Sequence, residues 1–276
     1  MLKNQKGFSH VLIFVVIIIL AAVGFAGWRV MNADKDDKKQ QNNTSADQGT
    51  SSGAEVSWSF NGETWQSSGT PPACPDPLLQ PFTDFSKATT VLYPGQTRGG
   101  NYKPHGGLRF DQSTNEIIVT APIDAAVYRG SRYIEANEHQ FMFDFINSCG
   151  IMFRLDHLLE LSPKLQDLAD KLPPAKENDS RTTPISGASV KAGEEIATAV
   201  GFPQTNNVTF DFGLYDLRQP NEASKGSAYA ADHSSAKETA YYAVCWLDNF
   251  GSATSLQLKA LPGGDQSAGK TSDYCK

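Results

Sequence analysis

The chain has 276 residues, of which 39% are hydrophobic and 20% charged, and its formal net charge is −6. This composition fits one globular domain with appended segments. The mild acidity and the lack of a long Lys/Arg block argue against nucleic-acid binding. No strand leads into a Gly-rich phosphate-binding turn, so we expect neither nucleic acid nor nucleotide as a partner.

The N-terminal residues have the pattern of a membrane anchor. Lys3 and Lys6 precede an uncharged run from Val11 to Trp28. At about 1.5 Å per residue, this run is about long enough to cross the ~30 Å hydrocarbon core of a bilayer. Lys and Arg residues next to a membrane span remain on the cytoplasmic side. We therefore expect a cytoplasmic tail at residues 1–9 and a transmembrane signal anchor at 10–31. The rest of this single-pass cell-membrane protein would then lie outside the cytoplasm.

Two other interpretations of the N-terminus remain open. A cleaved signal peptide has a shorter apolar region of ~7–15 residues and a small-residue cleavage site, for which Ala21–Gly24 would serve. The segment Lys6–Ser9 and the apolar run after it also resemble the leader of type IV prepilins, although Leu12 stands where those leaders carry a glutamate.

The remaining segments predict a linker followed by a β-rich domain. Residues 32–56 are polar and charged without apolar periodicity, which is typical of a flexible linker, and 57–98 form an entry segment. Short apolar or alternating runs with turn residues between them then predict an all-β sandwich or barrel. The expected strands are 116–122, 125–130, 140–146, 150–155, a turn followed by a strand within 190–201, a half-buried strand at 208–214, and 241–247.

Between these strands the pattern changes three times. Residues 162–172 have a proline at their second position and carry leucines at helical spacing, which predicts a helix. Residues 173–183 are polar and predict a surface loop. Residues 221–239 are rich in Ala, Ser and Lys and predict a long loop or a loose helix.

The four cysteines predict disulfides, which are the default for an even number in an exported domain. They permit three pairings. We favour Cys245–Cys275, which closes the C-terminal extension, and Cys74–Cys149, which fixes the entry segment to the domain. Buried free thiols are the alternative, and the absence of a Cys-x-x-Cys spacing leaves a zinc ribbon or a thioredoxin-type site unsupported.

Several short segments follow one another in a specific order. They are His105–Gly107, a strand ending at Thr120–Pro122, Val127–Gly130, Asp156–Leu158, the turn Val190–Ile196, and the closing strand 208–214. This order resembles the lysostaphin-type (LytM-like, family-23) zinc endopeptidases, which cut peptide bridges in peptidoglycan. The resemblance implies a LytM-like β-sandwich, a duplicated hybrid motif, over residues 99–218, with a C-terminal extension at 219–276.

The family's zinc site maps onto five positions of this chain. The resemblance places His105 as the first ligand, and Arg109 stands where the family has an Asp ligand. His157 matches a catalytic histidine. On the closing strand, Thr209 stands in place of the second catalytic histidine and Asp211 in place of the third ligand. A catalytic zinc needs three protein ligands and an activated water, so most of this set is changed.

The replacements predict a site without metal. Arginine has no free lone pair for zinc, but its guanidinium pairs well with a carboxylate. We therefore expect a polar cluster of His105, Arg109 and Asp211, with no cofactor and a vestigial His157. The alternative is a zinc site with an altered ligand set, such as His105, Asp111 and Asp211.

Three functions are consistent with these observations. The first is a membrane-anchored, extracytoplasmic LytM-like domain without zinc that binds cell-wall peptidoglycan or regulates a wall hydrolase. In this case the chain is not an enzyme. The second is an active zinc endopeptidase of peptidoglycan with an altered ligand set. The third is a pilin-like surface or adhesion protein, which the leader suggests and the long linker disfavours.

Overall fold

The computed structural model describes residues 56–276, except 112–113 and 265–267. The predicted tail at 1–9, the anchor at 10–31 and nearly all of the linker at 32–56 lie outside the described residues. Within the described ranges, no helix is long and apolar enough to cross a membrane.

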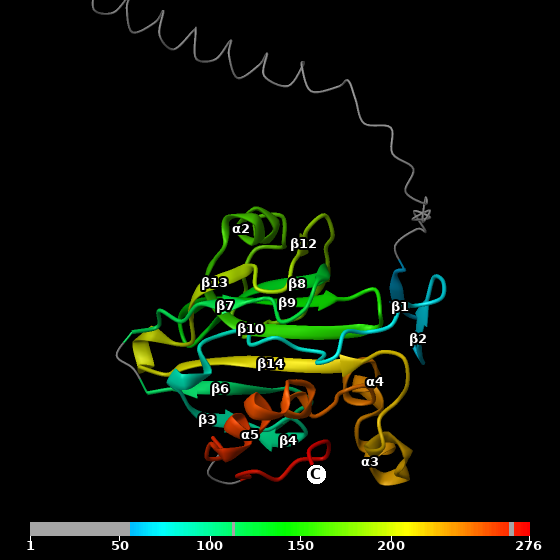
Figure 1. Cartoon of the computed structure of the whole chain (residues 1–276). Coiled ribbons are helices and arrows are strands. Elements are labelled where there is room, and N and C mark those ends of the chain that lie inside the picture. The colour runs from blue at the N-terminus through cyan, green and yellow to red at the C-terminus, as the bar shows by residue number, and fades with distance from the viewer. Residues whose placement is uncertain (1–55, 112–113, 265–267) are drawn as a thin grey trace, which may run out of the picture. The chain divides into compact units, whose positions relative to one another are not determined.

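An antiparallel sheet of ten strands organises the described chain (Figure 1). Its main path runs β11-β8-β9-β10-β14-β6-β3, with β12 beside β8 and β13 beside both β10 and β7. Its strands are β3 (Ala88–Leu92), β6 (Gly106–Phe110), β7 (Val119–Thr120), β8 (Ala125–Glu135), β9 (Glu138–Ile146), β10 (Ile151–Leu161), β11 (Thr183–Pro184), β12 (Ser189–Val190), β13 (Glu195–Val200) and β14 (Val208–Asp216). Two small hairpins accompany it, β1 (Trp58–Phe60) with β2 (Trp65–Ser67), and β4 (Gln96–Arg98) with β5 (Asn101–Lys103). The prediction of an all-β fold is confirmed at this level.

The central strands are covered on both faces. Side chains alternate between the two faces of a strand, and on β14 both sets are buried, so the expectation of a half-buried strand at 208–214 is wrong. One set, which includes Phe210 and Phe212, lies in the main apolar core. The other set carries Asp211 and Tyr215 on the opposite face. There a second apolar cluster, built around Trp58 and Trp65 of the first hairpin, covers the Tyr215 end.

Strand β10 bends at His157. Its pairing with β14 ends at Asp156, and its register against β9 shifts between Leu155 and Leu158. The last part of β10, Leu158–Leu161, pairs with β13 instead. His157 has φ of 62°, a left-handed conformation that costs a non-glycine residue about 1 kcal/mol. Because of the bend, β10 pairs with β14 before His157 and with β13 after it. The His157 side chain therefore does not follow the regular alternation of side chains between the two faces of the sheet.

The helices are short and lie outside the main sheet (Figure 1). Helix α2 (Pro163–Ala169) falls within the predicted 162–172 and begins at its proline, and 173–182 is a loop as predicted. Most of the others belong to the C-terminal extension. The remaining elements are the 3-10 turns η1 (Phe85–Lys87), η2 (Pro203–Thr205), η3 (Ala223–Lys225), η4 (Ser234–Ala236) and η5 (Trp246–Asn249), and the helices α3 (Ser227–Asp232), α4 (Lys237–Ala240) and α5 (Ser252–Ala260).

The strand predicted at 241–247 is wrong. Ala243 makes a single bridge to Tyr215 beside β14, after which η5 begins at Trp246. The indole of Trp246 is fully buried and lies against Phe212 and Phe250, with ring centroids 5.5 and 6.2 Å away. The apolar residues at 241–247, which predicted a strand, are therefore mostly buried in the core although they lie in a turn region that leads into η5.

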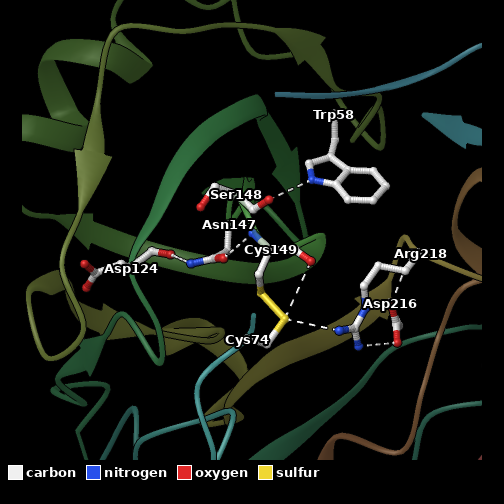
Figure 2. The surroundings of a disulfide bond; sticks show 8 residues. All are labelled: Trp58, Cys74, Asp124, Asn147, Ser148, Cys149, Asp216 and Arg218. Atoms are coloured by element: carbon white, nitrogen blue, oxygen red, sulfur yellow. Dashed lines mark hydrogen bonds and ion pairs between the residues drawn. A yellow bond between two sulfur atoms is a disulfide. The ribbon is translucent and has the colours of Figure 1, made fainter. Parts of the chain in front are cut away.

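Both predicted disulfides are confirmed. Cys74 is bonded to Cys149 and Cys245 to Cys275, closing loops of 75 and 30 residues. Figure 2 shows the first bridge at the end of the β9–β10 hairpin, where Arg218 donates Nη1 to Cys74 Sγ at 3.4 Å.

The first hairpin and the C-terminal extension are neighbours. Trp65 donates Nε1 to the carbonyl of Glu238 at 3.0 Å, and Lys237 Nζ pairs with Glu63 Oε2 at 2.5 Å. The C-terminal extension is therefore fastened to the first hairpin as well as to the sheet.

Candidate functional site

A strip of polar side chains crosses the second face of the sheet, next to the Trp58 cluster. The strand register sets Arg129 opposite Asp144, Asp144 opposite Arg154, and Asp156 opposite Asp211. We call this group the polar strip. Its members are Arg98, His105, Arg129, Tyr133, Asp144, Arg154, Asp156, His157 and Asp211.

Asp211 is the centre of one half of the strip. Its Oδ2 lies 2.9 Å from His105 Nε2, 3.7 Å from Arg98 Nη2 and 3.9 Å from His157 Nε2. The side chains of this group are 9–15% exposed. A carboxylate in so dry a position needs paired cations or hydrogen-bond donors, and here three side chains supply them.

The glycines after His105 let the strands approach this closely. Gly107 lies opposite Asp211, and a Cβ added there would meet Phe210 O at 2.4 Å and Asp211 Oδ1 at 3.0 Å. A side chain at this position would separate β6 from β14. The His-Gly-Gly sequence is therefore explained by backbone packing beneath the cluster.

Arg109 is not part of the cluster, and the predicted His105–Arg109–Asp211 arrangement is wrong in this respect. Its side chain is exposed and donates Nη1 to Gly264 O at 3.0 Å. Arg98, from the β4–β5 hairpin, approaches Asp211 instead, held by the carbonyls of Tyr93 and His105. The expected pairing of guanidinium with Asp211 therefore occurs, but with a different arginine.

The surroundings of His105 and Asp211 set their protonation. Burial lowers the pKa of His105 more than the neighbouring Asp211 raises it, so the imidazole is neutral near pH 7. Burial alone would raise the pKa of Asp211, but His105, His157 and Arg98 hold it well below its usual range. His105 Nε2 thus donates to an ionised carboxylate, and its Nδ1 is buried without a partner among the described residues.

These pKa values predict a loss of stability in mild acid. A group whose pKa is lowered by folding binds fewer protons in the folded state than in the unfolded state, so its stabilising effect is lost as the pH falls. For His105 the loss begins below the unfolded pKa of about 6.5, and for Asp211 below about 4. We expect the melting temperature to fall between pH 7 and pH 5 in the parent, and to fall less in His105→Gln. Equal slopes in thermal unfolding would contradict this.

His157 is held from the other side by Tyr133 and Asp156. Tyr133 donates its hydroxyl to Asp156 Oδ1 at 2.6 Å and lies 3.2 Å from His157 Nδ1. The same Asp156 oxygen accepts the backbone N–H of His157 at 2.8 Å. The ring is thereby directed toward Asp211, so the structure brings His157, His105 and Asp211 together.

The other half of the strip is a buried ion cluster. Asp144 is 0% exposed and accepts two hydrogen bonds from Arg154, at 2.7 and 2.8 Å, and one from Arg129 at 2.5 Å. Burial alone would raise the pKa of Asp144, but the two arginines lower it to about 2. Arg129 also pairs with Glu238 at 2.7 Å, which connects the cluster to the C-terminal extension.

The donor set does not fit a zinc ion. The structure describes no group of three or more His, Cys, Asp or Glu residues in an arrangement that could hold a metal. Arg98 brings a permanent cation to the carboxylate that would be the central ligand, and like charge repels a metal. Asp111, a member of the alternative ligand set, lies beyond the end of β6 and is exposed. We therefore derive no reaction step through zinc.

A phosphate-loop spacing occurs near the C-terminus. Gly264–Thr271 reads Gly-x-x-x-x-Gly-Lys-Thr. A phosphate loop joins a strand to a helix, but this segment follows helix α5, and no helix begins after it in the described residues. Lys270 donates Nζ to the carbonyl of Lys259 at 2.6 Å. The spacing therefore lacks the structural context of a nucleotide site.

Sequence reasoning missed Arg98, Tyr133 and the ion cluster. A signal for the cluster was present, because Asp144 and Arg154 each interrupt an apolar run on the two arms of one hairpin. Opposite charges facing each other across a hairpin indicate a pair. Arg98 carried no such signal, since its position depends on the fold of the β4–β5 hairpin.

The polar strip presents hydrogen-bonding groups, two histidine rings among them, that can orient a polar ligand. Comparison of the chain with protein-family profiles, with curated proteins and with solved structures finds no match.

Proposed function

We propose that this chain is a membrane-anchored, extracytoplasmic LytM-like domain without a zinc site, which binds peptidoglycan or regulates a cell-wall hydrolase. The order of the segments between residues 99 and 218 supports the family, and the apolar run at 11–28 supports the anchor. The observation that carries the proposal is the Asp211 cluster, in which Arg98 and two histidines surround one carboxylate oxygen.

The cluster favours binding over catalysis. A hydrolytic metal centre keeps an open coordination position for water, whereas the positive charge beside Asp211 comes from a fixed guanidinium. The strip is largely buried, and Arg98, Arg129 and His157 keep 10–15% exposure. Donors held in this way on a rigid sheet suit recognition of an extended peptide, whose backbone groups need partners.

Sedimentation with insoluble peptidoglycan tests the proposal. We expect the full chain, kept in mild detergent, to sediment with purified peptidoglycan, and Asp211→Asn to bind about tenfold more weakly, the loss of about one charge-assisted hydrogen bond. Asp179→Asn removes a half-buried carboxylate outside the polar strip and should bind like the parent. Circular dichroism confirms that both variants are folded.

Two results would redirect the proposal. No sedimentation, combined with a changed cleavage rate when the chain is added to a wall hydrolase, would favour the regulatory role over direct binding. Close to one equivalent of zinc in protein purified without chelators, together with cleavage of peptidoglycan peptides, would establish the alternative of an active zinc endopeptidase and contradict the ligand mapping.

A further inference from the structure

A cationic pocket lies at the edge of β8, away from Asp211. It has a volume of about 340 Å³ and is formed by β8 and the loop that follows α2. The basic and hydroxyl-bearing residues in its lining are Ser131, Arg132, Lys176, Arg181, Thr182 and Thr183.

Arg132 is the fixed donor of this pocket. Its Nε donates to the carbonyl of Pro173 at 2.7 Å, which orients the guanidinium. Its two terminal amino groups have no protein partner in the part of the chain that the structure describes. An oriented guanidinium with two free amino groups can bind an oxyanion through two parallel hydrogen bonds.

The pocket has an excess of positive charge. Asp179 is the one acid in its wall, and it is bound by Arg181 through two hydrogen bonds of 2.7 and 2.6 Å. The hydrogen bond from Arg181 lowers the pKa of Asp179 to about 2, so this pair stays ionised and neutralises itself. Arg132 and Lys176 then leave the pocket with a net charge of +2, on a chain whose net charge is −6.

Hydroxyl groups complete the donor set. Ser131 is 4% exposed and lines the pocket. Thr182 and Thr183 add two more hydroxyl-bearing residues to its lining. A hydroxyl group can donate a hydrogen bond to an anionic oxygen.

We propose that this pocket binds a phosphoryl group carried on a small polar molecule such as a polyol or a sugar. A carboxylate would use the guanidinium alone, whereas the three oxygens of a phosphoryl group can also reach an ammonium and the hydroxyls. The volume leaves room for a substituent beyond the phosphoryl group. The ligand is either a soluble phosphate ester or the headgroup of a phospholipid. The pocket is independent of the peptidoglycan proposal, because it shares no residue with the polar strip.

Calorimetric titration of the full chain in mild detergent tests this pocket. The probes are inorganic phosphate, glycerol phosphate, dihexanoyl phosphatidylglycerol and, as the carboxylate control, acetate. We expect saturable binding of glycerol phosphate, weakened at least tenfold in Arg132→Gln and about threefold in Lys176→Gln. Lys87→Gln removes an exposed cation outside the pocket and should bind like the parent.

The exposed Lys176 keeps the test valid if Arg132→Gln does not fold. Tighter binding of the short-chain lipid than of glycerol phosphate identifies the headgroup as the source, and the reverse order identifies a soluble ester. Either order supports the site. The proposal is overturned if no phosphate probe binds, if both pocket variants bind like the parent, or if acetate binds as tightly as phosphate.

Discussion

Replacing Asp144 by alanine is expected to destabilise the folded chain by about 3–5 kcal/mol, because it leaves buried positive charge without its carboxylate. Asp144 is the shared partner of Arg154 and Arg129, and its side chain is 0% exposed. A loss of this size is a large part of the 5–15 kcal/mol that stabilises a typical domain. Urea unfolding followed by tryptophan fluorescence measures it.

The pair of Asp179 and Arg181 at the surface provides a control. It has the same two-hydrogen-bond geometry, but its arginine side chain is 85% exposed and its carboxylate 23% exposed. Because water solvates such charges when the pair is broken, Asp179→Asn should shift the unfolding midpoint little. Similar shifts for Asp144→Ala and Asp179→Asn would show that burial does not govern the energy of the first pair.

Removal of the Cys74–Cys149 disulfide is expected to cost about 4.5 kcal/mol. The bridge closes a loop of 75 residues that contains the strands from β3 to β9, and an open loop of this length gives the unfolded chain more freedom. The double variant Cys74→Ala/Cys149→Ala, compared with the parent in urea, measures the cost.

The second bridge is the control for loop length. Cys245–Cys275 closes 30 residues, so its removal should cost less, about 3.5 kcal/mol by the same relation. A larger loss for the shorter loop would mean that contacts in the folded state, such as Arg218 with Cys74 Sγ, matter less than those around Cys245.

Local patterns predicted the parts of this fold that depend on neighbours in sequence. The β9–β10 hairpin around Asn147 follows from two apolar arms and a polar turn, and α2 follows from its proline and leucine spacing. Both disulfides could be paired because each one closes a recognisable segment. The segment 241–247 failed, since its apolar residues are buried by tertiary packing of Trp246 rather than by strand pairing.

The candidate site was predicted in part for a similar reason. His105, His157 and Asp211 lie on different strands, and the resemblance in segment order was enough to bring them together. The arginine was misassigned because Arg109 and Arg98 stand four and seven residues from His105. Which of the two arginines reaches Asp211 depends on the conformation of the β4–β5 hairpin. No periodic pattern in the sequence predicts that conformation.

The contacts between the first hairpin and the C-terminal extension also affect how the chain folds during synthesis. Trp65 reaches its partner Glu238 across 173 residues. At about 5–20 residues per second, roughly 10–35 s pass between the appearance of one partner and the other. During that interval the indole and the sheet face beneath it are exposed, and contacts so distant in sequence form slowly. During this period the nascent chain can be bound by a chaperone and fold, or it can be cut by a protease and degraded.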